Sequence, residues 1–139
     1  MPRMSNTFTV TFPGGVRVDA SYRGHVVHTD QPAPLGESSA VSPFDLLMAS
    51  LATCMGYYAL RFCQERELPT EGMGLTLASE RDPERKRVRT IRVELTAPEG
   101  FPGKYEDAIV RAMDQCAVKK LIHEPPDFEL TVTQAATSR

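Results

Sequence analysis

Hydrophobic and polar residues alternate along the first thirty residues of the chain. The segments TFTVTF (7–12), VRVDASY (16–22) and HVVHTD (25–30) show this alternation, and the short sequences PGG and RG separate them. Alternation places successive side chains on opposite faces of a strand, and Gly and Pro mark the turns between strands. The pattern therefore predicts three antiparallel strands.

A long helix is predicted after the segment 31–42, a loop rich in Pro, Gly and Ser. Ser42 is a good N-cap residue, Pro43 suits the first helical position, and Asp45 stands in the first turn. We expect the helix to run to about Glu67, because a proline follows shortly afterwards.

The first half of this helix is uncharged from residue 46 to residue 60. A helix that is apolar on nearly every side is expected to be buried on nearly every side. The run is short for a membrane span and is interrupted by Ser50, Thr53 and Gly56, so no membrane association is expected.

The second half of the chain predicts a strand pair, a helix and a last strand. Residues 73–98 form the pair, with a charged turn near Asp82–Pro83, and FELTVTQA (128–135) forms the last strand. The helix runs from about Lys104 to Ile122. Its apolar stripe contains Ile109, Ala112, Met113, Cys116, Ala117 and Leu121.

The order of strands, long helix, strands, helix and strand predicts an α+β fold. At 139 residues we expect a single domain spanning 1–139. A net charge of −2 gives no reason to expect a nucleic acid or an acidic membrane as partner. The first ten residues have no apolar core typical of an export signal, so a cytoplasmic location is expected. The three cysteines are then free thiols, metal ligands or redox groups rather than a disulfide framework.

Helix geometry separates the three cysteines. Cys54 and Cys63 are nine residues apart, so they lie on opposite sides of the helix and about 13 Å apart along its axis. This separation is too large for a disulfide. Cys116 lies on the apolar stripe of the second helix, and the pattern permits a contact between Cys54 and Cys116 if the two helices pack together. Composition alone favours a packing role for Cys54, because free cysteine is commonly a small buried hydrophobe.

A family resemblance changes this balance. SPFDLLMASLATCMGYYAL (42–60) is similar to the central-helix motif of the OsmC/Ohr family, and MDQCAVKKLI (113–122) stands where that family has its second cysteine. The order of elements matches over about residues 7–134. The resemblance implies an OsmC-like fold with a long buried central helix, an intertwined homodimer with active sites at the subunit interface, and thiol-dependent peroxidase activity in stress defence.

By this resemblance Cys54 is the peroxidatic cysteine. Its thiolate attacks the O–O bond of an organic or inorganic hydroperoxide and becomes a sulfenic acid, which Cys116 resolves as a disulfide. No cofactor is implied, but an external dithiol must reduce the disulfide before the next turnover.

A buried thiol needs a nearby cation, because apolar burial raises the pKa of cysteine. The family supplies an arginine from the N-terminal strand region. Arg17 best matches that position, and Arg23 is the alternative. Arg61, seven residues beyond Cys54 and on the same helix face, is an independent candidate.

Two positions depart from the family pattern. Phe44 stands where the hydroperoxide-specific branch has a glutamate, and Ala117 stands where a proline usually follows the second cysteine. Both departures indicate a divergent OsmC-like branch. Phe44, Tyr57 and Tyr58 are candidates for lining a substrate pocket, although core packing also explains the tyrosines.

Two other interpretations stay open: a non-enzymatic OsmC-like protein that binds a small apolar ligand at the dimer interface, and a structural protein whose cysteines only pack. His25, His28 and His123 have no recognisable metal-ligand spacing, so no metal is expected. RDPERKRVRTIR (81–92) mixes both charge signs without aromatic residues, which is typical of a solvated hairpin rather than a nucleic-acid site.

Overall fold

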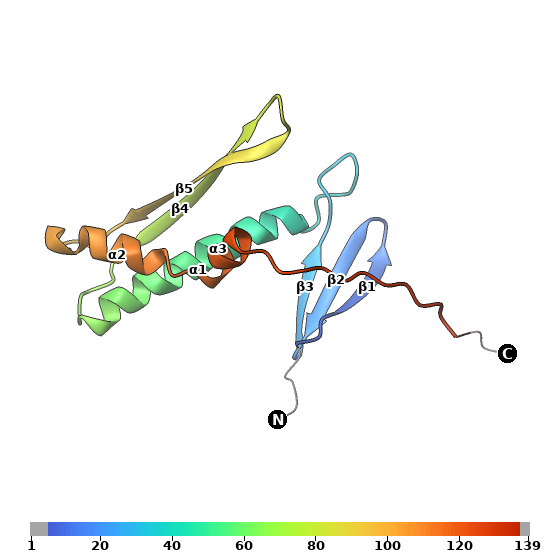
Figure 1. The fold of residues 1–139 in the computed structure, drawn as a ribbon, viewed down its shortest axis with the longest axis horizontal. Helices are drawn as coiled ribbons and strands as arrows, with labels where there is room; N and C mark the ends of the chain where they lie inside the picture. The colour runs from blue at the N-terminus through green and yellow to red at the C-terminus, as the bar shows by residue number, and fades with distance from the viewer. Residues whose placement is uncertain (1–5, 137–139) are drawn as a thin grey trace.

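The computed structural model describes residues 6–136, which form two antiparallel sheets and a set of helices (Figure 1). The hairpin and the second helix run alongside the long central helix, and the three-stranded sheet lies beyond the N-terminal end of that helix. In chain order the elements are β1 (Thr9–Gly14), β2 (Arg17–Tyr22), β3 (His25–Thr29), α1 (Pro43–Glu65), β4 (Gly74–Asp82), β5 (Arg87–Thr96), the 3-10 turn η1 (Gly103–Tyr105), α2 (Glu106–Met113) and α3 (Ala117–His123).

Both sheets follow the alternation in the sequence. The strands β1, β2 and β3 are antiparallel neighbours in that order, and β4 pairs with β5 as a separate hairpin. The turn between β4 and β5 contains the predicted Asp82–Pro83 step, where the backbone N–H of Glu84 donates to the Asp82 carboxylate over 3.0 Å. The strands predicted from 7–30 and 73–98 are therefore confirmed.

Helix α1 begins where its capping sequence predicts. The Ser42 hydroxyl accepts the backbone N–H of Asp45 at 3.1 Å, and Pro43 occupies the first turn, where its missing N–H costs nothing. The helix ends at Glu65, and the backbone N–H of Leu68 donates to the Cys63 carbonyl to close its last turn. The C-terminal end of α1 therefore lies two residues before Glu67, where the sequence predicted the helix to end.

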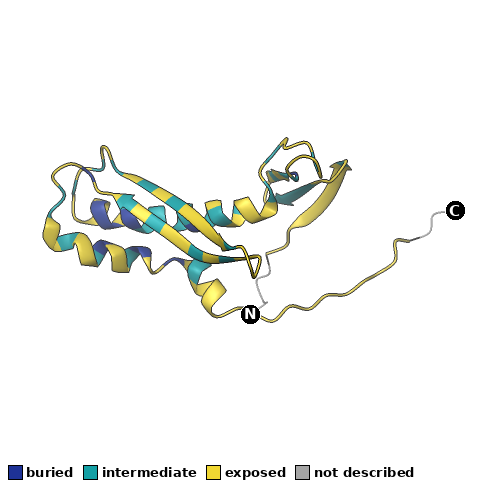
Figure 2. Cartoon of the chain, turned by 90° about the horizontal axis from the view of Figure 1, so that it is seen from above, coloured by how far each residue is buried: buried dark blue, intermediate teal, exposed yellow. Residues whose placement is uncertain are grey.

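The hydrophobic core lies between the C-terminal half of α1, helix α2 and the hairpin, where Figure 2 shows the buried residues gathered. The Phe62 ring meets the rings of Phe101 and Tyr105, with centroid distances of 6.4 and 5.6 Å. The fully or nearly buried members of this core are Ala59, Phe62, Cys63, Ile109 and Met113.

The predicted second helix is wrong as one continuous element, because the chain breaks it at residues 114–116. Cys116 leaves the helical conformation, with φ −49° and ψ 120°, and its sulfur accepts the backbone N–H of Lys119 at 3.5 Å. A capping side chain that satisfies a helix N–H allows a new helix to start there. Helices α2 and α3 are therefore separate, and Leu121 lies exposed instead of on the core stripe.

The predicted last strand at 128–135 is also wrong for this chain, since none of its residues pairs with a strand in the part that the structure describes. The segment is extended and leads away from the body of the molecule (Figure 2). Its alternating apolar side chains Phe128, Leu130 and Val132 are 79%, 91% and 93% exposed. Alternation sets which face a side chain takes, but a strand exists only with a hydrogen-bonded neighbour.

The expectation that the first half of α1 is buried on nearly every side is wrong for the single chain. Leu51 is buried, but Phe44 and Leu47 are exposed. By length and composition alone, α1 is long and apolar enough to cross a membrane. Of the 18-residue apolar stretch of α1 that meets this criterion, 22% is buried inside the single chain. The protein contacts that α1 makes come from α2, α3 and β4, which leaves much of its apolar surface uncovered in one chain.

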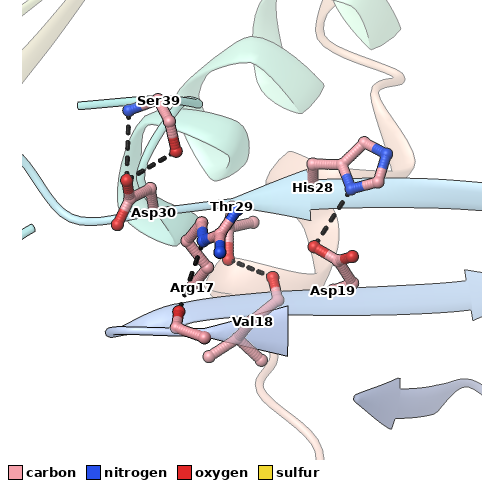
Figure 3. A network of polar contacts seen from close by, with 8 residues as sticks. Arg17, Val18, Asp19, His28, Thr29, Asp30 and Ser39 are labelled. Atoms are coloured by element: carbon pink, nitrogen blue, oxygen red, sulfur yellow. Dashed lines mark hydrogen bonds and ion pairs between the residues drawn. The ribbon is translucent and has the colours of Figure 1, made fainter. Parts of the chain in front are cut away.

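The loop before α1 folds around Asp30, a feature that the sequence did not point to. The buried Asp30 carboxylate accepts the Ser39 hydroxyl at 2.6 Å and the Ser39 backbone N–H at 3.1 Å (Figure 3). It also accepts the backbone N–H groups of Gln31 and Glu37 at 2.8 and 3.3 Å. These donors lower the pKa of Asp30 to about 2, with the Ser39 hydroxyl as the main cause. A side chain at Gly36 would lie 2.3 Å from the Gln31 carbonyl, so this close turn requires glycine.

Replacement of Asp30 tests this loop. The carboxylate form is favoured by folding, so its contribution is present above the unfolded pKa of 3.8 and is lost as the pH falls toward about 2. We expect Asp30→Asn to lower the melting temperature at neutral pH, with the difference from wild type shrinking between about pH 4 and pH 2. Thermal melts from pH 2 to 7 measure this. Glu37→Gln, an exposed carboxylate of the same loop, is the control, and a wild-type–variant difference that is independent of pH would contradict the assignment.

Candidate functional site

The structure brings Cys54 and Cys116 together. Cys54 lies in the middle of α1 and is half-buried, while Cys116 is completely buried at the start of α3. Helix α3 packs on α1, and the two thiols lie near enough for each to shift the pKa of the other. The proximity that the helical stripe permitted is therefore present, although Cys116 stands at a helix start rather than in the middle of a helix.

Groups at the start of α3 shift the pKa of Cys54. Burial raises the pKa of Cys54, but hydrogen bonds from the Cys116 thiol and from the backbone N–H groups of Val118 and Ala117 outweigh it and hold the pKa below its ordinary value. Donors aimed at the sulfur favour the charged form. Cys54 is thus the thiol of this pair that ionises first.

The pKa of Cys116 shifts in the opposite direction. Burial raises the pKa of Cys116, and the neighbouring Cys54 raises it further, while the backbone N–H of Lys119 acts against both. The two sulfurs share one environment but differ in their donors, so the favoured state is a Cys54 thiolate beside a Cys116 thiol. A low-pKa thiolate beside a second thiol is the arrangement that thiol redox chemistry requires.

Cys63 lies outside this pair. It is completely buried in the core, and its sulfur lies 4.0 Å from the Met73 sulfur. Burial raises the pKa of Cys63 more than the nearby Arg66 charge lowers it. Cys63 therefore packs in the core, and the prediction that it does not pair with Cys54 is supported.

The two N-terminal arginine candidates lie on the three-stranded sheet. Arg17 is exposed, and its Nε donates to the Gly14 carbonyl at 3.3 Å (Figure 3). Arg23 is in the turn between β2 and β3, with its guanidinium 5.2 Å from the centre of the Tyr22 ring. Neither arginine is among the groups that set the pKa of Cys54 within the described part of one chain.

Arg61 shares a helix with Cys54 but turns toward the C-terminal end. Its guanidinium donates to Gln64 at 3.0 Å and pairs with Glu65 at 3.3 Å. The lowered pKa of Cys54 therefore comes from neutral donors, and no cation contributes to it in the described residues of a single chain.

The three aromatic pocket candidates do not gather around Cys54. Phe44 is exposed in the first turn of α1, and Tyr57 is 56% exposed with its ring edge-on to Tyr58 at 5.3 Å. Tyr58 lines an open groove of about 470 Å³ between α1 and α2. In the single chain these residues form a surface rather than an enclosed pocket.

A small apolar cavity between the helices and the hairpin is a feature that the sequence did not indicate. It has a volume of about 190 Å³ and lies between α1, β5 and α3. Its α1 residues, Leu51 and Met55, bracket Cys54 along the helix. The sequence pattern predicts apolar faces on these helices and strands, but only the folded chain shows that the faces of α1, β5 and α3 leave a cavity between them. The lining residues are Leu51, Met55, Ile91, Val93, Lys119, Ile122 and His123.

The histidines do not gather into a metal site in the part of the chain that the structure describes. No group of three His, Cys, Asp or Glu side chains suited to a metal occurs among residues 6–136. His28 instead pairs with Asp19 across neighbouring strands, with 3.0 Å between Nδ1 and Oδ1 (Figure 3).

The fold and the thiols define a class of α+β protein with one thiol, Cys54, on its central helix and a second, Cys116, at the start of a later helix that packs on it. A family model described as OsmC-like protein matches residues 36–131. The chain belongs to this OsmC-like family. A comparison with curated proteins gave no match.

Solved structures share the fold. One of them is a Psychrobacter arcticus 273-4 protein assigned to the osmotic stress induced and detoxification response. It is 26% identical to this chain, with a TM-score of 0.74, and the alignment covers 88% of this chain and 91% of that protein. The organic hydroperoxide resistance protein OsmC of Legionella pneumophila is 18% identical, with a TM-score of 0.56 and coverage of 88% and 91%. The organic hydroperoxide resistance protein OhrB of Bacillus subtilis is 17% identical, with a TM-score of 0.53 and coverage of 85% and 90%.

The order in which the thiols ionise gives a direct test of the site. We expect iodoacetamide to modify Cys54 at a lower pH than the other two cysteines, because its pKa is held below the ordinary value while burial raises the others. Mass spectrometry of each cysteine peptide across pH 5–10 measures the three profiles. Denatured protein is the control, in which the three profiles should coincide; a native Cys54 profile that lies above its denatured profile would contradict the site.

Proposed function

We propose that this protein is a thiol-dependent peroxidase that reduces hydroperoxides with Cys54 as the peroxidatic and Cys116 as the resolving cysteine. The observation that carries the proposal is the contact between a thiol of lowered pKa and a second thiol of raised pKa. The two members of the pair differ in the way that nucleophile and resolving thiol must differ. The site requires no bound cofactor for this chemistry.

The first step is oxidation of Cys54. Its thiolate attacks the terminal oxygen of a hydroperoxide, the O–O bond breaks, and the alkoxide takes a proton from solvent and leaves as the alcohol. The sulfur is oxidised to a sulfenic acid, and the peroxide is reduced by two electrons. Cys54 suits this role because it is the half-buried member of the pair and peroxide can reach it.

The second step closes the disulfide. The Cys116 thiol attacks the Cys54 sulfenic sulfur, and water leaves with the hydroxyl group and the thiol proton. An external dithiol then reduces the disulfide by exchange and is itself oxidised to a disulfide. The two thiols are neighbours in the fold, because α3 packs on α1 and each thiol shifts the pKa of the other, and this supports a direct disulfide between them.

Family membership supports the same class of chemistry. Two of the structural relatives are named organic hydroperoxide resistance proteins, and one of these is also described as a predicted redox protein. At 17% and 18% identity they support the proposal through the shared fold alone. A role in defence against oxidative or osmotic stress follows as part of the proposal.

The apolar cavity supports an organic substrate. Its walls are mostly aliphatic, and its volume of about 190 Å³ suits a small alkyl or aryl group. Two of its lining residues, Leu51 and Met55, belong to the same helix as Cys54. The same cavity favours the alternative function, in which the protein binds a small apolar ligand without chemistry. Consumption of peroxide by the native protein distinguishes the two.

We infer that the active assembly is a homodimer. Apolar side chains are exposed along one face of β1 (Phe8, Val10 and Phe12), on the first half of α1 and along the extended C-terminal segment. One folded chain rarely exposes so many apolar groups on adjoining surfaces unless they meet a partner. A second copy covers these surfaces, gives 128–135 a strand to pair with, and brings Arg17 of one copy toward Cys54 of the other. Phe44, Tyr57 and Tyr58 then line the interface near the substrate.

Cysteine variants test the peroxidase. We expect Cys54→Ser to reduce cumene hydroperoxide consumption to the rate without protein, because the serine hydroxyl does not ionise at neutral pH. We expect Cys116→Ser, without added thiol, to consume one equivalent of peroxide on forming the sulfenic acid and about one more as this sulfur over-oxidises to the sulfinic acid, and then to stop. The assay follows peroxide loss, with dithiothreitol as reductant for turnover and without it for this variant, and mass spectrometry identifies the sulfur state.

Cys63→Ser is the matched control, since this buried cysteine lies outside the pair and should retain wild-type turnover. Wild-type consumption by Cys54→Ser would contradict the peroxidase. An unreactive wild-type protein that retains an apolar molecule through purification would favour the binding function instead.

Sedimentation tests the homodimer. We expect the wild type to sediment as a dimer and Leu130→Asp to shift toward monomer, because a charge would enter the apolar interface. Thr131→Asp is the control, since the neighbouring side chain points to the opposite face of an extended segment. A wild-type monomer at micromolar concentration would contradict the inference, as would a protein that floats with phospholipid vesicles instead of self-associating.

A further inference from the structure

The open groove between α1 and α2 has no part in the proposed thiol chemistry. The two helices run side by side along it (Figure 1), and its volume is about 470 Å³. Along α1 it extends from Tyr58 to Arg66, away from the first half of the helix that the inferred dimer covers. The described residues that line it include neither Cys54 nor Cys116, so it is separate from the thiol pair.

The floor of this groove is apolar. The Phe62 ring belongs to the core, and Ala108 and Ala112 pack against that core from α2. The two alanines are four residues apart, so they lie on the same face of their helix. Because their side chains are single methyl groups, they leave room between the helices for an apolar group of several carbon atoms.

Cations line both sides of the groove. Arg61 and Arg66 come from the C-terminal end of α1, and Arg111 comes from α2. Glu65 supplies the one negative charge among the described lining residues, so three positive charges and one negative charge leave a net charge of +2. The whole chain has a net charge of −2, and this local excess of positive charge therefore favours an anion as ligand.

Contacts within α1 hold two of these cations in place. The Arg66 guanidinium lies 3.6 Å from the centroid of the Phe62 ring and donates to the Phe62 carbonyl at 3.1 Å. The Arg61 guanidinium donates to the Gln64 amide oxygen at 3.0 Å and pairs with Glu65 at 3.3 Å. A guanidinium has five N–H donors, so both keep donors for a ligand. Cations that are held before binding lose less conformational entropy when the ligand arrives.

We propose that this groove binds an amphiphilic organic anion, with its head between the arginines of the two helices and its apolar group on the floor. A carboxylate or a phosphate suits the head, because a guanidinium pairs with either through parallel N–H donors. The apolar group covers floor surface that water otherwise contacts. The site goes beyond the proposed peroxidase, since it uses neither of the reacting thiols.

Titration of the wild type with octanoate or octyl phosphate, below the micelle concentration, tests the site and distinguishes the two heads. We expect at least one of them to shift the backbone amide ¹H–¹⁵N resonances of Ala108, Arg111 and Ala112 saturably. 1-Octanol lacks the charge and should bind about fivefold more weakly, and acetate, which lacks the chain, more weakly still. Equal binding of 1-octanol would overturn the proposal, as would shifts confined to the cavity residues Leu51 and Met55 or no saturable shift by either anion.

Arg111→Gln tests the cations, because Arg111 is exposed on α2 and its replacement removes a charge while keeping a long polar side chain. We expect the affinity for the anion that binds the wild type to fall about threefold, the size of a partly exposed ion pair. Arg85→Gln, at an exposed arginine in the turn between β4 and β5, is the matched control and should bind as the wild type does. An unchanged affinity in Arg111→Gln, or an equal loss in Arg85→Gln, would overturn the proposal.

Ala108→Leu tests the floor, since the larger side chain fills the groove. We expect it to abolish binding of the anion, while Val110→Leu, at an exposed position outside the groove lining, retains it. Full affinity in a folded Ala108→Leu protein would overturn the proposal, and Arg111→Gln keeps the test decisive if this variant does not fold. None of these measurements uses peroxide, so their outcome and that of the peroxidase assay are independent.

Discussion

The thiol of Cys116 is the contact on which the arrangement of the site depends. Its sulfur accepts the Lys119 N–H and so caps the start of α3 after the break at 114–116. The same side chain is completely buried and is the neighbouring thiol that shifts the pKa of Cys54. One buried sulfur therefore both starts α3 and forms the thiol pair with Cys54.

The second constraint is the apolar surface that one chain leaves open. Helix α1 is packed on the side of α2, α3 and β4, where Cys54 meets Cys116, and exposed on much of the remainder. One chain thus brings the two thiols together but leaves apolar surface of α1 uncovered. Arg17 begins β2, in the sheet that lies beyond the N-terminal end of α1.

Local signals made much of the fold predictable. Strand alternation, the Ser42 cap and the charged turn at Asp82–Pro83 act between residues close in sequence, so their outcome can be read without the rest of the chain. The helix break was not predictable in the same way, because Cys116 and Ala117 also fit the apolar stripe of a continuous helix. Asp30 gave no signal either, since its four donors come from a loop without periodicity.

The sequence by itself determined the class of fold, the start of α1 and the separation of Cys54 from Cys63, because helix period and capping are local properties. The family pattern added the expectation that Cys54 and Cys116 form a pair. Only the tertiary structure decided that the two thiols are neighbours and that their pKa values shift in opposite directions. Those properties depend on burial and on hydrogen-bond donors from a distant segment, and these exist only when α3 packs on α1.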